Sequence, residues 1–172
     1  QKLIIDGVRE IVTNYDVDGI HLDDYFYPST SESIDSESYS AYRALGGKLS
    51  LGDWRRENVS SLMSELHSVV KSLKPNAVLS VSPMADIKKD YNNCYADIPL
   101  WCSEPGYIDI IMPQIYFGFD NSSKPFSKTA EEWESIIKTD SVKLCVGLAI
   151  YKSGREDGNA GEAEEGGAHP GN

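Results

Sequence analysis

Cysteine is scarce in this sequence, with three residues among 172: Cys94, Cys102 and Cys145. They are too few and too irregularly spaced for a disulfide scaffold or a zinc knuckle. We expect them to be small, buried apolar residues. A disulfide between Cys94 and Cys102 stays open for an oxidising compartment, because spacing alone does not establish the geometry of the bond.

Positive charge and long apolar runs are also in short supply. Sixteen Lys and Arg residues stand against 27 Asp and Glu residues, so the net charge is −11 at pH 7. Such a chain repels the phosphates of nucleic acids, and we expect no nucleic-acid partner. No run approaches the roughly 18 apolar residues of a membrane-spanning helix, and the opening QKLIIDGVRE lacks the pattern of a signal peptide. The sequence therefore predicts no transmembrane segment and carries no targeting signal of its own.

No Asn-Gly or Asp-Gly pair joins two strands, and predicted helices alternate with predicted strands along the chain. Apolar residues at steps of three and four predict one helix that ends near Asn14 and another, capped by Asp53, that ends before Pro75. A short helix is predicted within residues 91–104, and a further one begins with a capping box at Thr129. The predicted strands cover residues 17–27, 78–81, 108–116 and 143–151.

Two stretches carry no such periodicity. Residues 29–52 are polar and form a connection much longer than the usual loop between a strand and a helix, so we expect a functional or disordered loop. Residues 152–172 are rich in glycine and acidic residues and contain no aliphatic run. We expect this tail to be a flexible loop or a truncated end.

The alternation predicts an α/β fold with parallel strands and crossover helices. A closed TIM (β/α)₈ barrel has eight strands in about 250 residues, and this chain supplies about four consecutive βα units. We therefore expect residues 1–151 to be a fragment of a TIM-barrel catalytic domain, from the later middle of a longer barrel.

Working residues of parallel βα folds gather at the carboxyl ends of the strands. The candidates at these ends are His21, Asp23, Asp24, Tyr25, Tyr27, Ser80, Ser82, Asp86, Gln114, Tyr116, Gly147 and Tyr151. This set contains carboxylates, phenols and an amide but no Cys–His pair and no phosphate loop. We expect neither a cofactor nor a bound metal.

Asp23 and Asp24 are the strongest catalytic candidates in this set. A period of two places Asp23 on the same strand face as His21 and Tyr25, and Asp24 on the other face. A carboxylate at this position can act as a nucleophile, a general acid or a charge that stabilises an oxocarbenium-like transition state. A turn-forming or capping Asp is the structural alternative.

Other residues are expected to bind the substrate. Tyrosines at rigid strand ends offer flat apolar surfaces with a polar rim, which suit sugar rings, although packing is the alternative for about half of the aromatic residues. Gln114 in a buried strand needs hydrogen-bond partners, either a ligand hydroxyl or an internal group. Arg55 at the start of the long helix can orient a carboxylate, and the alternative is a solvated surface. His21 and Asp23 could also be two ligands of a metal, which is a less favoured reading.

The chain resembles the glycosyl hydrolase-like 10 family, formerly domain of unknown function 187, as far as about Lys152. The resemblance rests on the segments DGVREIVTNYDVDGIHLDDYFYP, WRRENV, VSP, CYAD, YIDIIMPQIYFGF, PF and VGLAIYK in this order. It implies a TIM-type barrel in bacterial glycoside hydrolases that are often secreted or lipid-anchored, one branch of which cleaves peptide-free peptidoglycan strands. Asp23 and Asp24 are then the catalytic candidates. The expected substrate-binding residues are His21, Tyr25, Tyr27, Arg55, Asp86, Gln114, Tyr116 and Tyr151.

More distantly, the strand order is similar to that of chitinase-type barrels, whose run D-x-x-D-x-D-x-E ends in the catalytic glutamic acid. Asp18, His21, Asp23 and Tyr25 occupy the four places here. Because the second Asp and the final Glu are replaced, the chitinase mechanism cannot be assumed. The proton donor must then come from Asp24, Asp86, the long loop or another strand.

The leading hypothesis is a glycoside hydrolase that cleaves a bacterial cell-wall or related polysaccharide, and we expect it to work outside the cytoplasm. Asp23 would be its nucleophile or charge stabiliser, and Asp24 its acid/base or the residue that orients it. The alternatives are a carbohydrate-binding barrel without catalysis and a metal-dependent sugar deacetylase that uses His21 and Asp23.

Overall fold

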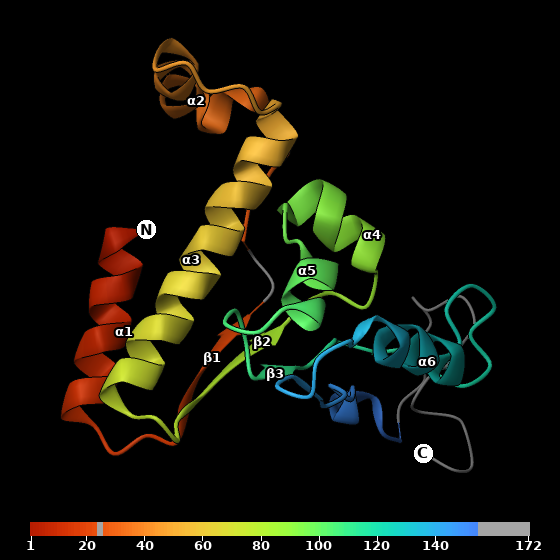
Figure 1. The fold of residues 1–172 in the computed structure, drawn as a ribbon. Helices are drawn as coiled ribbons and strands as arrows, with labels where there is room; N and C mark the ends of the chain where they lie inside the picture. Colours follow the sequence, from red (N-terminus) through yellow and green to blue (C-terminus); the bar gives the residue numbers. More distant parts are fainter. Residues whose placement is uncertain (24–25, 155–172) are drawn as a thin grey trace.

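Four parallel strands form the central sheet of the computed structural model, which describes residues 1–23 and 26–154. The strands lie in chain order, and each is linked to the next by helices (Figure 1). They are β1 (Gly19–Asp23), β2 (Val78–Ser82), β3 (Ile110–Ile111) and β4 (Lys143–Leu144). The predicted α/β fold with parallel strands is confirmed, and it is consistent with part of a TIM-type barrel.

Helices α1 (Lys2–Asn14) and α3 (Leu51–Leu73) lie side by side and run in the same direction (Figure 1). The predicted ends of both helices, near Asn14 and before Pro75, are confirmed. The start of α3 differs from the prediction, since Ser50 rather than Asp53 is the N-cap. Its hydroxyl accepts a hydrogen bond from the backbone N–H of Asp53 at 3.1 Å.

Three shorter helices follow β2 and β3: α4 (Ile87–Lys89), α5 (Ile98–Ser103) and α6 (Phe126–Ile136). A π-helical turn, Asp90–Cys94, joins α4 to α5. The prediction that Thr129 caps a helix is wrong, because α6 already begins at Phe126. The Thr129 hydroxyl instead donates to the carbonyl of Pro125 at 3.0 Å, an arrangement that Ser and Thr adopt inside helices.

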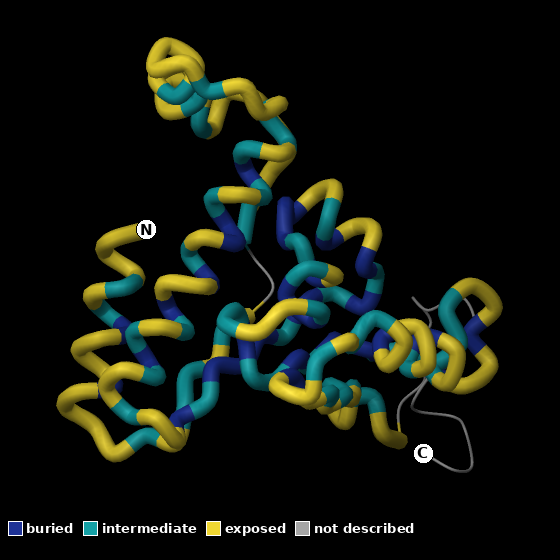
Figure 2. The backbone as a smooth tube through the Cα atoms, in the orientation of Figure 1, coloured by how far each residue is buried: buried dark blue, intermediate teal, exposed yellow. Residues whose placement is uncertain are grey.

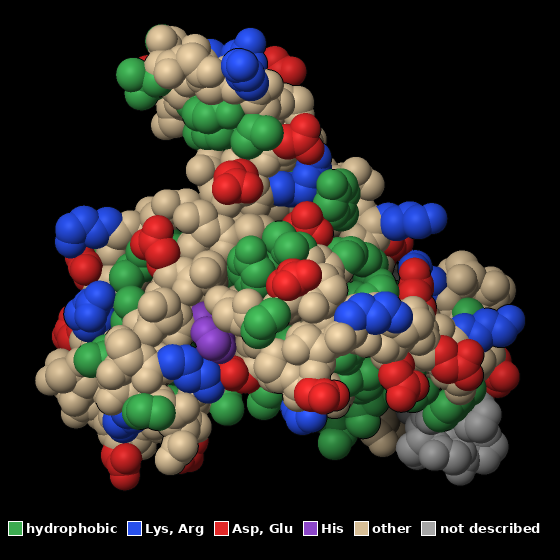
Figure 3. All heavy atoms as spheres, viewed as in Figure 1, with side chains coloured by type: hydrophobic (Ala, Val, Ile, Leu, Met, Phe, Trp, Pro, Cys, Tyr) green, Lys and Arg blue, Asp and Glu red, His purple; other side chains and the backbone are tan. Residues whose placement is uncertain are grey.

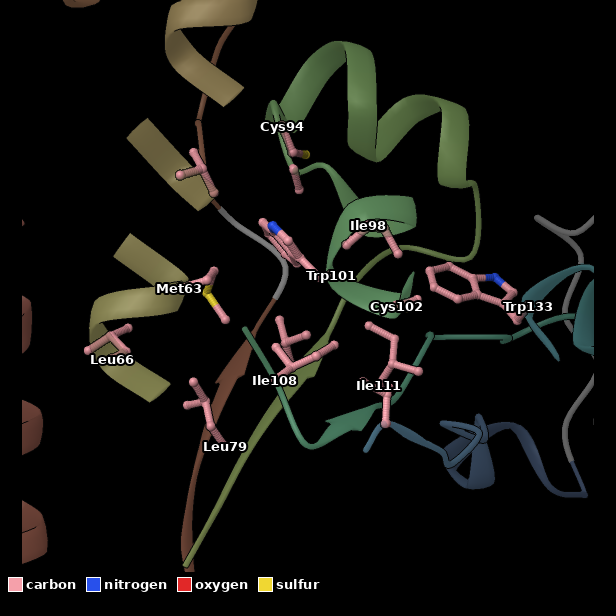
Figure 4. Close-up of a cluster of buried hydrophobic side chains, with 14 of the residues drawn as sticks. Met63, Leu66, Leu79, Cys94, Ile98, Trp101, Cys102, Ile108, Ile111 and Trp133 are labelled. Atoms are coloured by element: carbon pink, nitrogen blue, oxygen red, sulfur yellow. The ribbon is translucent and has the colours of Figure 1, made fainter. Parts of the chain in front are cut away.

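The core lies between the sheet and the helices that cover one of its faces. Leu79 and Ile111 from the strands belong to one cluster of buried side chains with Met63 of α3 and Trp101 of α5 (Figure 4). The buried parts of the backbone follow the sheet and the inner sides of these helices (Figure 2). Each buried indole N–H has an acceptor: Trp101 donates to the Ser60 hydroxyl at 2.9 Å and Trp133 to the Ala85 carbonyl at 3.0 Å.

The cysteines divide between two environments, and none of the three is in a disulfide bond. Cys94 and Cys102 are buried as predicted, whereas Cys145 beside β4 is exposed. Burial raises the pKa of the Cys102 thiol to about 12, so this thiol stays protonated and unreactive.

Strands β3 and β4 are much shorter than predicted, although backbone pairing continues past them. Pro113 has no N–H to donate, so the regular ladder stops before it. Pairing resumes at Gln114, whose N–H donates to the carbonyl of Pro83 at 2.9 Å. Isolated parallel bridges then join Gln114 to Met84 and to Gly147, so the pairing between the strands extends to the residues of the candidate site.

The segment between β1 and α3 is not the loop that its composition predicts. It contains a 3₁₀ turn, Glu32–Ile34, and helix α2, Ser36–Ala44. Helix α2 stands away from the sheet beyond the start of α3, and hydrophobic side chains are visible on the surface of this projection (Figures 1 and 3). The predicted tail is described only as far as Gly154, and the rest of it lies outside the described residues.

Rings from both helices stabilise this projection. The ring centroids of Tyr39 and Tyr42 lie 5.3 and 5.9 Å from that of Trp54 on α3. The Tyr42 hydroxyl also accepts hydrogen bonds from the N–H groups of Lys48 and Leu49, both at 3.0 Å. These long-range contacts explain why a polar sequence with a weak helical pattern folds here.

Among the described residues, no helix combines the length and apolar character needed to cross a bilayer.

Asp109 ties the amino ends of two strands to α3. Its carboxylate accepts hydrogen bonds from the Leu79 N–H at 2.7 Å, the Lys71 ammonium at 2.9 Å and the His67 ring at 3.2 Å. Burial opposes ionisation of Asp109, but these hydrogen bonds outweigh it and hold the pKa of the carboxyl below its usual value. The ionised form therefore stabilises the fold.

We predict that Asp109→Asn lowers the free energy of unfolding by about 1–3 kcal/mol at neutral pH, because Lys71 loses its charged acceptor. The folded-state pKa is depressed, so the difference from the unsubstituted protein is present above about pH 5 and shrinks as the pH falls below about 4. Urea unfolding at several pH values measures it, with exposed Asp140→Asn as the control. A difference that grows on acidification would contradict this role.

Candidate functional site

Polar side chains occupy the uncovered face of β1 and β2. Alternation along β1 leaves His21 and Asp23 exposed on one face and turns Leu22 toward the core on the other. In the parallel register, His21 lies beside Ser80 and Asp23 beside Ser82. The predicted placement of His21 and Asp23 on a common face thus agrees with the strand pattern.

Asp23 contacts Gln114 across the intervening strand. The Gln114 Nε2 donates to the Asp23 Oδ1 at 2.8 Å and to the Ser82 carbonyl at 3.0 Å. A carboxylate from the end of β1 and an amide that follows β3 are thereby joined over β2. This contact links two predicted site residues directly.

His21 is held by the neighbouring strand. Its Nδ1 lies 2.8 Å from the hydroxyl of Ser80, which is itself 3.3 Å from the Ile20 carbonyl. If the hydroxyl donates to that carbonyl, His21 donates through Nδ1 and its Nε2 is an acceptor. The ring is therefore oriented on the same face as Asp23.

A second cluster is built around Arg55, whose side chain has no exposed area. The guanidinium donates to both carboxylate oxygens of Asp35, at 2.9 and 2.5 Å, and to the Tyr95 hydroxyl at 2.9 Å. It also donates to the carbonyls of Thr30 and Ser31, at 3.2 and 2.8 Å. Arg55 thus fastens the segment after β1 to α3.

Tyr27 belongs to this cluster. Its hydroxyl donates to Asp35 at 3.0 Å, and its ring lies edge-on to that of Tyr95, with centroids 5.2 Å apart. Burial and the hydrogen bond to Asp35 raise the pKa of Tyr27 to about 12. The hydroxyl therefore stays protonated and engaged with Asp35.

Charges within the cluster reinforce one another. The hydrogen bonds from Arg55 hold the pKa of Asp35 below its usual range, and Asp35 in turn raises the pKa of Arg55. Tyr95 adopts a left-handed backbone with φ of 53°, which costs a non-glycine residue about 1–2 kcal/mol. Its hydrogen bond to Arg55 and its buried ring offset that cost.

Asp86 lies at the start of α4, where its carboxylate caps the helix. It accepts hydrogen bonds from the N–H groups of Lys88 and Lys89, both at 3.1 Å, and lies 3.5 Å from the Lys124 ammonium. Burial opposes its ionisation, but the Lys89 N–H and Lys124 outweigh that effect and lower the pKa of Asp86.

The remaining predicted residues are two tyrosines and two positions next to Asp23. The rings of Tyr116 and Tyr151 meet edge to face, with centroids 6.3 Å apart, and Tyr151 is 62% exposed. Asp24 and Tyr25 lie outside the described residues. Within residues 1–23 and 26–154, no three His, Cys, Asp or Glu side chains come together as a metal site.

The structure therefore separates the predicted residues into groups. Asp23 with Gln114, and His21 with Ser80, belong to the sheet face, whereas Tyr27 and Arg55 belong to a buried cluster. Sequence reasoning missed Tyr95 as a partner of Arg55. No local signal could reveal it, because the two residues are 40 positions apart and meet only through the fold.

This α/β fold, with polar side chains at the carboxyl ends of parallel strands, is consistent with part of a β/α barrel. Within that class, the chain belongs to the glycosyl hydrolase-like 10 family, which matches residues 1–161. The predicted resemblance is thereby confirmed.

Two curated relatives are named glycosyl hydrolases. The chain is 35% identical over 170 residues to glycosyl hydrolase DigH of Escherichia coli strain K12, which covers 90% of this chain and 38% of that protein. It is 31% identical over 169 residues to glycosyl hydrolase YngK of Bacillus subtilis strain 168, covering 88% of this chain and 33% of that protein. The chain thus spans roughly a third of the length of these relatives.

We predict that Arg55→Met lowers the free energy of unfolding by about 3 kcal/mol, because it leaves the Asp35 carboxylate without its cation. This loss of unfolding free energy is at the lower end of the range for a broken buried ion pair, because 13% of the Asp35 side chain is exposed to solvent. Urea unfolding measures the loss, and limited proteolysis should show earlier cleavage within residues 28–35.

The neighbouring Arg56→Met is the control, because Arg56 pairs with the exposed Asp53 and should matter much less. Adding Asp35→Asn to Arg55→Met should recover part of the loss by removing the unpaired charge. Equal destabilisation by the two arginine substitutions would contradict the assignment.

Proposed function

We propose that the full-length protein is a glycoside hydrolase that cleaves a bacterial cell-wall polysaccharide, with peptide-free peptidoglycan strands as the substrate to test first. The observation that supports this most directly is the Asp23 carboxylate at the carboxyl end of β1, where it accepts a hydrogen bond from Gln114. The chain also belongs to a family of glycosyl hydrolase-like proteins. A glycosidic bond is cleaved through carboxylate chemistry at such a position.

In this proposal Asp23 is the nucleophile or the charge that stabilises the oxocarbenium-like transition state. Both roles require a carboxylate that is exposed to the substrate and fixed in direction, and Asp23 meets both requirements. The open aromatic surface of Tyr151, packed against Tyr116, offers a face for a sugar ring. His21 adds a polar ring on the same face as Asp23.

The proton donor is a separate residue. Asp35 and Asp86 have lowered pKa values, because Arg55 holds one and the Lys89 N–H with Lys124 holds the other against the effect of burial. A carboxyl that ionises this readily carries little of the proton that a general acid needs at neutral pH. We therefore propose Asp24 for the acid/base role, or for its orientation, with the rest of the long loop and another strand as the alternatives.

A carbohydrate-binding barrel without catalysis is the second candidate. Asp35 is held in an ion pair and Asp86 caps a helix, so neither is placed to act as a catalytic acid. Among the described candidates, Asp23 is then the carboxylate on the uncovered face of the sheet, and this favours binding without catalysis. A metal-dependent deacetylase has less support. His21 and Asp23 are two ligands at most, and no third His, Cys, Asp or Glu joins them in the described part of the chain.

We also propose that the protein works outside the cytoplasm, as the family resemblance implies. Accessibility of the full-length protein to protease in spheroplasts and in the culture medium, compared with that of a cytoplasmic marker, tests this location. Protection equal to that of the marker would count against it.

We predict that the full-length protein releases new reducing ends from peptide-free peptidoglycan strands, and that Asp23→Asn lowers the rate by about 10²–10⁴-fold. The amide keeps the size of the side chain but cannot attack the anomeric carbon or stabilise positive charge as a carboxylate does. The matched control is Asp16→Asn. Asp16 is fully exposed and lies three residues before the amino end of β1, so this variant should keep full activity.

Each outcome separates the candidates. Glycan binding without new reducing ends, unaffected by Asp23→Asn, would favour the binding barrel. A loss of less than tenfold in a folded Asp23→Asn protein would remove Asp23 from the catalytic role while leaving the glycosidase in place.

A further inference from the structure

Both N–H bonds of the Gln114 side-chain amide are directed at acceptors at the carboxyl end of the sheet. The primary amide has two N–H bonds, and Nε2 directs them to the Asp23 Oδ1 at 2.8 Å and to the Ser82 carbonyl at 3.0 Å. Both partners are oxygen atoms that accept. The NH₂ end of the amide must therefore face them, and the flipped orientation would set oxygen against oxygen.

The backbone that carries this amide is fixed on both sides. The Gln114 N–H donates to Pro83, and parallel bridges join Gln114 to Met84 and Gly147. At Gly147 the strands approach so closely that a Cβ atom would lie 3.2 Å from the Pro113 carbonyl and 3.5 Å from the Gln114 Cα. The amide thus projects from a rigid part of the ladder.

An amide supplies a hydrogen bond without supplying a proton. A donor such as a carboxylic acid in this place could exchange its proton with Asp23, and a lysine would bring a competing charge. Gln114 does neither, and the hydrogen bond from its Nε2 fixes the direction of the Asp23 Oδ1. The Ser82 carbonyl holds the amide itself in place.

We propose that Gln114 is a positioning residue that acts through Asp23, rather than a contact for a substrate hydroxyl, an inference that rests on the proposed function. Its Nε2 sets the orientation of the Asp23 carboxylate relative to the sugar. Loss of the donor removes this constraint on the direction of Oδ1, which slows the chemical step and leaves substrate affinity intact.

The first test is steady-state kinetics of the full-length protein on peptide-free glycan strands. Gln114→Met keeps the length of the side chain and removes the donor, and kcat should fall about 10- to 100-fold with KM within about twofold. The control is Asn92→Leu, which removes an exposed amide that donates to the Lys88 carbonyl at 2.8 Å, and both constants should stay within about twofold. A raised KM with unchanged kcat would overturn the inference.

The second test does not need turnover. In the Asp23→Ala background, glycan affinity is measured by calorimetry with and without Gln114→Met. A positioning residue has nothing left to position there, so the Kd should be unchanged within about twofold, whereas a direct substrate contact would weaken it by about tenfold. A tenfold weakening would overturn the inference.

Failure of the inference is distinct from failure of the proposed function. If the full-length protein releases no reducing ends, the glycosidase proposal fails whatever the Gln114 variant does. If it is active and Gln114→Met raises KM alone, the glycosidase stands and Gln114 binds substrate instead. Thermal unfolding of each variant confirms that a lost kcat does not reflect a lost fold.

Discussion

Parallel pairing of the four strands is the constraint on which the rest of the structure depends. Because every strand runs the same way, all carboxyl ends lie along one edge of the sheet and all amino ends along the other. Asp23 and Gln114 are 91 positions apart in the chain, and the register of β1, β2 and β3 brings them into hydrogen-bond contact. Each contact at this edge therefore depends on the crossover helices between the strands.

The two edges use carboxylates differently. At the amino edge, Asp109 is held by Lys71, His67 and a backbone amide, so its charge is balanced and its contribution is to stability. At the carboxyl edge, Gln114 gives Asp23 a hydrogen bond that brings no charge. In TIM-type barrels, the amino end serves stability and the carboxyl end serves chemistry, and the role proposed for Asp23 follows that division.

Local patterns in the sequence predicted the parts of the fold that depend on local physics. The apolar spacing of α1 and α3, the break at Pro75 and the alternation around His21 and Asp23 needed no distant partner, and the structure agrees with them. The ordered segments also predicted the family, which is confirmed, and the parallel sheet is consistent with part of the barrel that the family implies.

Other features depend on residues far apart in the chain, and the sequence could not reveal them. Helix α2 is stabilised by rings that pack on Trp54, and its own sequence is too polar to indicate a helix. The partners with which pairing continues after Pro113, namely Pro83, Met84 and Gly147, come from other parts of the chain. The charge of Arg55 predicts a place on the surface, but the fold buries it and brings Asp35 and Tyr95 around it.

The same physics narrows the mechanism of the proposed glycosidase. Cleavage needs two carboxyl groups with opposite tasks, one that stays ionised and one that carries a proton. Cations and backbone amides hold Asp35 and Asp86 in the ionised form, so adding them to Asp23 would give more anions and no acid. The acid must then sit where burial or a neighbouring anion keeps it protonated. Asp24 is the proposed acid in this chain, and the long loop or another strand is the alternative source of the proton.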